Sequence, residues 1–207
     1  MTGRRITLVC DELRGIAGGG LGTVYTFLAV ALARLGHDVD VLYFGKPPTE
    51  PIDGYWAGLY ERAGVRVRAA PRCHEQVDPP FARLLDIDEA LSSEPPEVVI
   101  AQDLAGSAYV PLRRRQLGLD FEDTLFVVRC SGTRRWINDA ARKVRVLPGA
   151  LAVTVLEQAA LELADVVVAE SQYMVDWMKQ QGWRLPEQTH VIPSIMVSLL
   201  RGRLRVG

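Results

Sequence analysis

The chain has 207 residues, of which 48% are hydrophobic, and it carries 24 basic residues against 25 acidic ones. That length can bury the core of one domain and is too short for two complete doubly wound domains. The balanced charge lacks the basic excess of proteins that bind nucleic acid or a membrane surface. We therefore expect one domain with a small or uncharged partner and no nucleic-acid partner.

Cysteine and histidine spacing bears on the cellular compartment and on metals. The three cysteines form no CxxC pair, which argues against a disulfide framework or a zinc site, and the three histidines are too scattered to hold a metal. The apolar run from Ile6 to Cys10 is too short for a signal peptide or a membrane span. We expect a cytoplasmic protein with no bound metal and no membrane span.

Short β-branched runs alternate with segments of helical periodicity along the chain. The runs predict buried parallel strands at Ile6–Cys10, Val39–Phe44, Val65–Val67, Val98–Ala101, Leu125–Val128, Val166–Ala169 and Val191–Ile192. The helical segments are Leu21–Leu35, Tyr55–Ala63, Phe81–Leu91, Ala105–Leu117, Asn138–Leu163 and Ser171–Gln181. This order predicts an α/β fold, a single Rossmann-like doubly wound parallel sheet with helices on both faces.

Glycine and proline mark the ends of these elements. Glycines follow four of the predicted helices, where a left-handed terminal residue is common: Gly36, Gly64, Gly118 and Gly182. Pro148-Gly149 is expected to kink or split the segment Asn138–Leu163. We expect a domain over residues 1–195 and a basic tail over residues 196–207, which contains three arginines and no acid.

The turn Gly18-Gly19-Gly20-Leu21-Gly22-Thr23 leads into the first predicted helix. Free backbone N–H groups at such a helix start favour a phosphate, although the glycines could also simply relieve a tight turn. The first strand ends about eight residues before the glycines, and Tyr43-Phe44-Gly45 places no acid at the end of the second strand. Both features differ from a dinucleotide-binding fold. A nicotinamide or flavin cofactor is therefore not expected.

Several ordered motifs together carry a family resemblance. They are Ile6-Thr7-Leu8-Val9-Cys10, Gly19-Gly20-Leu21-Gly22-Thr23-Val24, Leu32-Ala33-Arg34-Leu35-Gly36-His37-Asp38-Val39, the stretch from Ala164-Asp165-Val166 to Tyr173-Met174, and Val191-Ile192-Pro193. In this order the sequence resembles the N-terminal domain of GT-B glycosyltransferases of the glycogen and starch synthase type and their family 4 relatives. The resemblance implies half of a GT-B fold that holds a sugar or glycoside acceptor.

The resemblance also implies roles for particular residues near the predicted cleft. Gly19, Gly20 and Leu21 would offer backbone N–H groups to the leaving diphosphate. Asp103 would contact an acceptor hydroxyl, although it could equally cap the helix that starts near Ala105. These assignments name Asp103 as a candidate catalytic residue.

The loop after the fifth strand departs from the family. Ser131-Gly132 stands where relatives carry His-Gly, and a hydroxyl lacks the proton-transfer capacity of an imidazole. Ser131 is the second candidate catalytic residue, and Gly132 a substrate-binding one. Arg134 and Trp136 could bind an anionic or sugar-ring acceptor, or could be a surface arginine beside a packed indole.

The family binds its nucleotide sugar on a second domain, and 207 residues leave no room for one. The first hypothesis is the acceptor-side domain of a nucleotide-sugar-dependent, retaining hexosyltransferase that is inactive without a donor-binding chain. The alternative is a non-catalytic carbohydrate- or protein-binding module derived from such an enzyme. A self-associating remnant is a third hypothesis. We expect no cofactor beyond a donor held by the missing domain.

Overall fold

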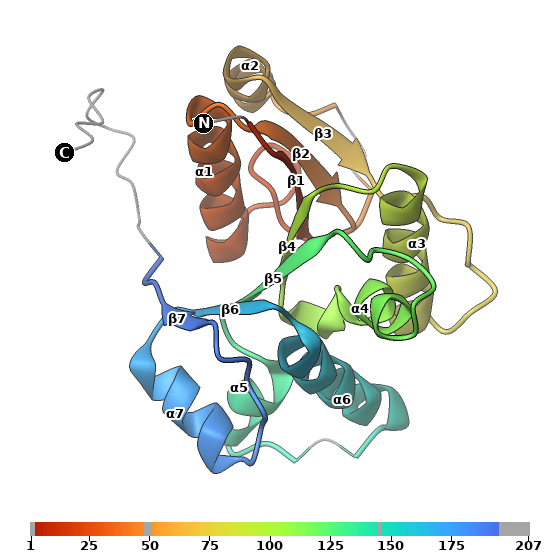
Figure 1. Ribbon diagram of the computed structural model, residues 1–207, viewed down its shortest axis with the longest axis vertical. Helices are drawn as coiled ribbons and strands as arrows, with labels where there is room; N and C mark the ends of the chain where they lie inside the picture. The colour runs from red at the N-terminus through yellow and green to blue at the C-terminus, as the bar shows by residue number, and fades with distance from the viewer. Residues whose placement is uncertain (1–2, 48–50, 145, 195–207) are drawn as a thin grey trace.

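The computed structural model describes residues 3–47, 51–144 and 146–194. In this part of the chain one seven-stranded sheet has the order β3-β2-β1-β4-β5-β6-β7 (Figure 1). All neighbouring strands pair in parallel, so the predicted doubly wound α/β fold is confirmed. The strands are β1 Arg5–Cys10, β2 Asp38–Tyr43, β3 Val65–Ala69, β4 Val98–Gln102, β5 Leu125–Cys130, β6 Val166–Ala169 and β7 Thr189–Val191. The predicted tail at 196–207 lies outside the described residues.

The helices lie close to the predicted segments. They are α1 Gly20–Arg34, α2 Gly54–Ala63, α3 Pro79–Ser93, α4 Tyr109–Gln116, α5 Arg134–Ala140, α6 Pro148–Leu163 and α7 Gln172–Gln180. The expected split at Pro148-Gly149 is confirmed, because α6 begins at Pro148. The segment Ala105–Leu117 was predicted as one helix and is two, a 3₁₀ turn η1 (Leu104–Gly106) and then α4. The break follows from left-handed backbone at Ala105 and Gly106.

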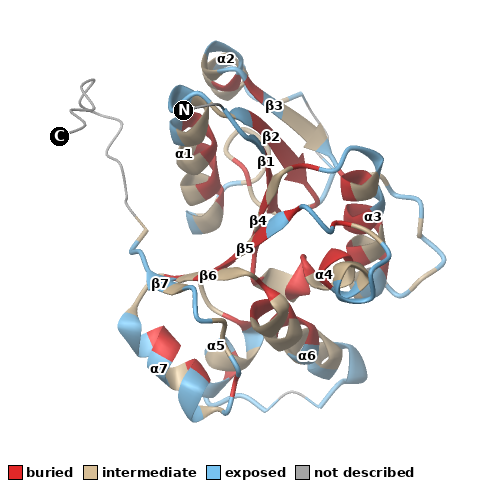
Figure 2. Cartoon of the chain, viewed as in Figure 1, coloured by how far each residue is buried: buried red, intermediate tan, exposed pale blue. Residues whose placement is uncertain are grey.

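Helices cover the two faces of the sheet unequally. In Figure 1, α1 and α2 lie on one side of β1, β2 and β3, and α3, α4, α6 and α7 lie on the other side. Successive side chains of a strand point to opposite faces of the sheet. Leu8 therefore packs with Tyr25 of α1, while Val9 packs toward α3. Figure 2 shows the buried residues concentrated along the strands and the inner sides of the helices.

The far strands β5 and β6 are better covered on one side than on the other. Val128 and Val167, on the side of α6 and α7, are fully buried. Val127 and Val168, which point to the side of α1, are half-buried. Parallel sheets are normally buried on both faces, so this second layer is thinner than the first. No helix among the described residues is long and apolar enough to cross a membrane.

Candidate functional site

A cleft of about 450 Å³ opens at the carboxyl ends of the strands. Its lining comes from loops after β1, β2 and β4 and from the starts of α5 and α6: Asp11, Phe44, Leu104, Ala105, Arg134, Leu147, Gly149, Ala150 and Val153. Ligands of open parallel sheets bind at this edge because the loops that follow the strands converge there. We call this pocket the cleft. Apolar side chains form most of its wall, with one carboxylate and one guanidinium on it.

Asp11 supplies the carboxylate of the cleft. It follows β1 directly, and its Oδ1 accepts a 2.9 Å hydrogen bond from Nε2 of Gln102, the buried last residue of β4. Partial burial raises the pKa of Asp11. The contact holds the carboxylate in one orientation at the cleft wall. Asp11 was not among the residues predicted from the sequence, although its position directly after a buried strand was the available signal.

Asp103 lies beneath this edge and joins two loops. Its carboxylate is buried, with the residue 1% exposed, and Oδ2 accepts a 3.0 Å hydrogen bond from the backbone N–H of Gly132. Burial raises the pKa of Asp103. The helix-capping alternative is wrong, because the side chain makes no capping bond to η1 and ties the β4 loop to the β5 loop instead. Its contact with an acceptor hydroxyl stays a prediction.

Glu157 of α6 is a second buried acid that holds loops in place. Its two carboxylate oxygens accept hydrogen bonds from the backbone N–H groups of Ala105, at 3.0 Å, and Arg134, at 2.5 Å. Burial raises the pKa of Glu157 to about 7. Glu157 thereby fixes two lining residues of the cleft. The sequence signal was an acid among the apolar positions of a helix, between Leu156 and Ala160.

Ser131 belongs to a polar cluster next to the cleft. Its Oγ donates to Oε1 of Glu170 at 3.0 Å, and the Oγ of Ser194 donates to the same oxygen at 2.6 Å. Arg129 donates to Ser194 at 3.1 Å and lies 3.8 Å from Glu170. Its buried Nε has no partner among the described residues. The Ser131 hydroxyl is therefore already engaged, and Arg129, Glu170 and Ser194 were not selected from the sequence.

The other predicted residues of the β5 loop separate into different environments. Arg134 lines the cleft. Trp136 packs against the core, and a Cβ added to Gly132 would lie 3.6 Å from its ring. Thr133 begins α5 by accepting a hydrogen bond from the N–H of Trp136. The structure thus brings Arg134 into the cleft and uses Trp136 in packing.

The start of α1 holds a carboxylate of the protein itself. Oε2 of Glu12 accepts a 3.2 Å hydrogen bond from the N–H of Gly22. A Cβ added to Gly19 would lie 1.9 Å from that same oxygen. Gly19 therefore leaves space for an acid at the positive end of the helix dipole. Glu12 thus lies where the sequence predicts that Gly19, Gly20 and Leu21 meet a phosphate.

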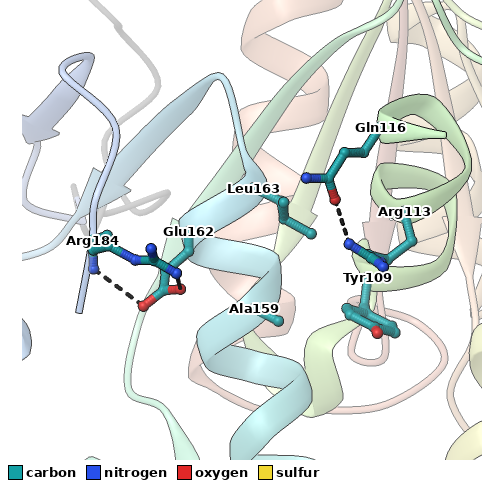
Figure 3. Close-up of a pocket in the computed structure, with 7 residues that line it drawn as sticks. All are labelled: Tyr109, Arg113, Gln116, Ala159, Glu162, Leu163 and Arg184. Atoms are coloured by element: carbon teal, nitrogen blue, oxygen red, sulfur yellow. Dashed lines mark hydrogen bonds and ion pairs between the residues drawn. The ribbon is translucent and has the colours of Figure 1, made fainter. Parts of the chain in front are cut away.

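A second pocket, of about 310 Å³, lies between α4 and α6 (Figure 3). Figure 3 shows the Arg113 side chain turned to Gln116 of its own helix, and Arg184 turned to Glu162 of α6. Both arginines of this pocket are thus engaged by neighbouring side chains, and its α6 residues belong to the end of that helix that is remote from the cleft. The cleft is therefore the stronger candidate site.

From the sequence alone, the run Arg113-Arg114-Arg115 predicts a helix face that is exposed to solvent. The structure differs for two of these arginines. Arg114 pairs with Asp88 at 2.8 Å and with Asp120 at 3.2 Å. Arg115 pairs with Asp165 at 2.5 Å and lies over the ring of Phe126. The solvated-face interpretation is wrong for these two arginines, because they connect α4 to neighbouring elements.

Solved structures of several enzymes share this fold. Sucrose-phosphate synthase from Thermosynechococcus elongatus matches with a TM-score of 0.66 and 18% identity, over 92% of this chain and 48% of that one. The calicheamicin glycosyltransferase CalG4 matches with a TM-score of 0.53 and 14% identity, over 95% of this chain and 53% of that one. A UDP-N-acetylglucosamine 2-epimerase matches with a TM-score of 0.54 and 10% identity, over 91% and 48%. The chain spans about half the length of these proteins.

Sequence comparison gives the family. Among curated proteins, none matches the chain significantly. The family model described as "Glycosyl transferase 4-like domain" matches residues 19–194, which is most of the chain and spans α1 to the end of the described residues. The chain therefore belongs to the glycosyl transferase 4-like domain family.

Proposed function

We propose that this chain is the acceptor-side half of a nucleotide-sugar-dependent, retaining glycosyltransferase. The observation that carries the proposal is the family match over residues 19–194, together with a cleft at the ligand-binding edge of the sheet. The donor would be held by a second domain, because the chain corresponds to 48% of the related synthase. The retaining stereochemistry rests on the resemblance to glycogen and starch synthases.

In this proposal the cleft binds the acceptor. Asp11 would accept a hydrogen bond from the acceptor hydroxyl, and its own contact with Gln102 would keep it oriented. Arg134 would attract an anionic or polar substituent, while Phe44 and Val153 would pack against apolar parts of the acceptor. Ser131 and Asp103 remain candidate catalytic residues.

The leaving diphosphate would bind at the start of α1. The N–H groups of Gly19, Gly20 and Leu21 would stabilise its developing charge. Glu12 must then move away, because two anions cannot share one helix terminus. We expect Glu12→Ala to strengthen binding of pyrophosphate to this loop.

The alternative is a non-catalytic carbohydrate- or protein-binding module. One observation favours it: Ser131 replaces the histidine of relatives and donates its hydrogen bond to Glu170. Self-association through the cleft edge would be a variant of this role. These alternatives predict binding without a need for a donor.

Transfer assays separate these functions. The purified chain is incubated with a panel of nucleotide sugars and glycoside acceptors, alone and fused to the donor-binding half of a related glycosyltransferase. We expect transfer from the fusion and none from the chain alone. In the fusion, Asp11→Asn should lower transfer at least about tenfold, whereas Asp139→Asn, an exposed acid on α5, should not.

Acceptor binding to the chain alone provides an independent measurement. Saturation-transfer NMR with the same glycosides should detect binding that Asp11→Asn or Arg134→Ala weakens. Robust transfer by the isolated chain would contradict the proposed incompleteness. A fusion that remains inactive even with Ser131→His, while glycoside binding persists, would favour the binding module.

A further inference from the structure

A group of exposed apolar residues lies beside the cleft. Five large ones lie on the connection between α5 and α6 and on the first turns of α6: Val144, Val146, Leu147, Leu151 and Val155. Their exposed fractions run from 50% for Leu151 to 88% for Val144. Figure 2 shows the described residues of this connection as exposed. These side chains are too exposed to contribute much to the packing of the core. Groups of exposed apolar residues often mark interaction surfaces.

Basic residues precede this apolar group in the chain. Residues 134–156 contain five arginine or lysine residues and one acid, Asp139. Arg134, Arg142 and Lys143 are exposed. In the described part of the chain none of the basic side chains of this stretch forms an ion pair with a carboxylate. The net charge of the whole chain is −1 because acidic residues elsewhere balance the basic residues of this stretch.

We infer that this basic apolar patch, formed by Arg142, Lys143, Val144, Val146 and Leu151, binds the surface of an anionic lipid bilayer. Apolar side chains flanked by lysine and arginine suit the boundary between acyl chains and negative headgroups. A protein partner with an acidic rim would complement the same basic charge, but the exposed valines lie on the irregular connection between α5 and α6, at the edge of the molecule in Figure 1, where they can contact the headgroup layer.

The patch also lies next to the cleft. Leu147 lines the cleft and is 68% exposed, between Val146 of the patch and the start of α6. Binding through the patch would therefore bring the mouth of the cleft to the lipid surface. The inference itself does not depend on sugar transfer, because it concerns the patch alone.

Vesicle sedimentation tests the inference with the full chain. Vesicles of phosphatidylcholine alone are compared with vesicles of phosphatidylcholine and phosphatidylglycerol. We expect partition to be at least about tenfold stronger into the anionic vesicles, since each basic residue near such a surface adds to the attraction. Added salt should weaken it, because the attraction is screened within a Debye length.

Two variants and two matched controls locate the surface. Arg142→Glu with Lys143→Glu, and separately Val144→Asp with Val146→Asp, should each lower the partition at least about tenfold. Arg34→Glu with Arg113→Glu is the control for the charge reversal. Leu35→Asp with Leu119→Asp is the control for the added acids, because these leucines are 74% and 64% exposed. Circular dichroism checks that every variant is folded.

Three outcomes would overturn the inference. Equal sedimentation with both kinds of vesicle would exclude recognition of anionic lipid. Loss of binding in the controls as well as in the patch variants would show that general charge is responsible. A dimer seen by analytical ultracentrifugation that Val144→Asp with Val146→Asp abolishes, in a chain that does not bind vesicles, would assign the patch to a second copy.

Discussion

At the scale of single residues, buried or half-buried acids organise the edge that bears the cleft. Glu157 accepts hydrogen bonds from one N–H group of the β4 loop and one of the β5 loop, and Asp103 accepts one from a second N–H group of the β5 loop. Backbone N–H groups that donate to a buried carboxylate replace part of the hydrogen bonding that water would provide. The cleft is therefore fixed by interactions that lie beneath it, in addition to the residues that face it.

The raised pKa of Glu157 gives a prediction about stability and pH. Its pKa is about 7 in the folded chain against an ordinary 4.5, so between these values the folded state binds more protons than the unfolded one. The contribution of Glu157 to the free energy of unfolding, about 3 kcal/mol, is therefore present below pH 4.5 and is lost as the pH rises through 7. Asp103 adds to this effect, and Arg134 opposes it.

Glu157→Gln should remove this component, because glutamine does not titrate. Urea unfolding of both chains between pH 4.5 and 7.5 measures it, and the stability of the natural chain relative to Glu157→Gln should fall as the pH rises. Asp139→Asn, at an exposed position, should follow the natural chain. Parallel pH profiles for the natural chain and Glu157→Gln would contradict the prediction.

At the scale of elements, the contact between η1 and α6 determines the shape of the β4 loop. Gly106 has φ of +67°, and a Cβ there would lie 2.6 Å from the backbone carbonyl of Leu156. The backbone of α6 cannot move aside as a flexible side chain could. The close approach of these two elements therefore requires glycine at this position.

Gly106→Ala should destabilise the chain by about 3 kcal/mol or more, from the backbone clash added to the left-handed conformation. Gly118→Ala is the matched control. Gly118 has φ of +66° and nothing within 4 Å of an added Cβ, so it should lose about 1 to 2 kcal/mol from conformation alone. Urea denaturation compares the two, and equal losses would contradict the proposed clash.

At the scale of the whole molecule, the two layers of the sheet differ in cover. Val167 points to the side of α6 and α7 and is fully buried, whereas its neighbour Val168 is half-buried on the other side. Adjacent side chains of one strand point to opposite faces of the sheet, so their burial shows how well each face is covered. A second domain or another chain could cover the half-buried strand residues on the side of Val168.

Threonine substitutions at these neighbours measure the asymmetry. Val167→Thr should cost about 1 to 3 kcal/mol, because a hydroxyl would be buried without a partner. Val168→Thr should change the stability by no more than about 0.5 kcal/mol, because water can reach it. Chemical denaturation of the two variants gives the comparison. A larger loss at Val168 than at Val167 would mean that the second face is covered in solution.

Local patterns predicted the fold because they act over short stretches. The alternation of β-branched runs with helical periodicity indicated a parallel sheet, and glycines such as Gly64 marked helix ends through their left-handed conformation. Pro148 also marked the start of α6 correctly. The break at Ala105 was not predictable, because it depends on the packing of η1 against α6.

The sequence by itself determined the α/β class, the end of most elements and the loops that form the ligand-binding edge. Tertiary structure alone decided which side chains of those loops face the cleft. Asp11 lies on its wall, Asp103 lies beneath it, and Glu12 occupies the start of α1. The physical reason is that each position depends on partners far along the chain, such as Gln102 for Asp11 and Gly132 for Asp103. No local pattern encodes the distance between such groups.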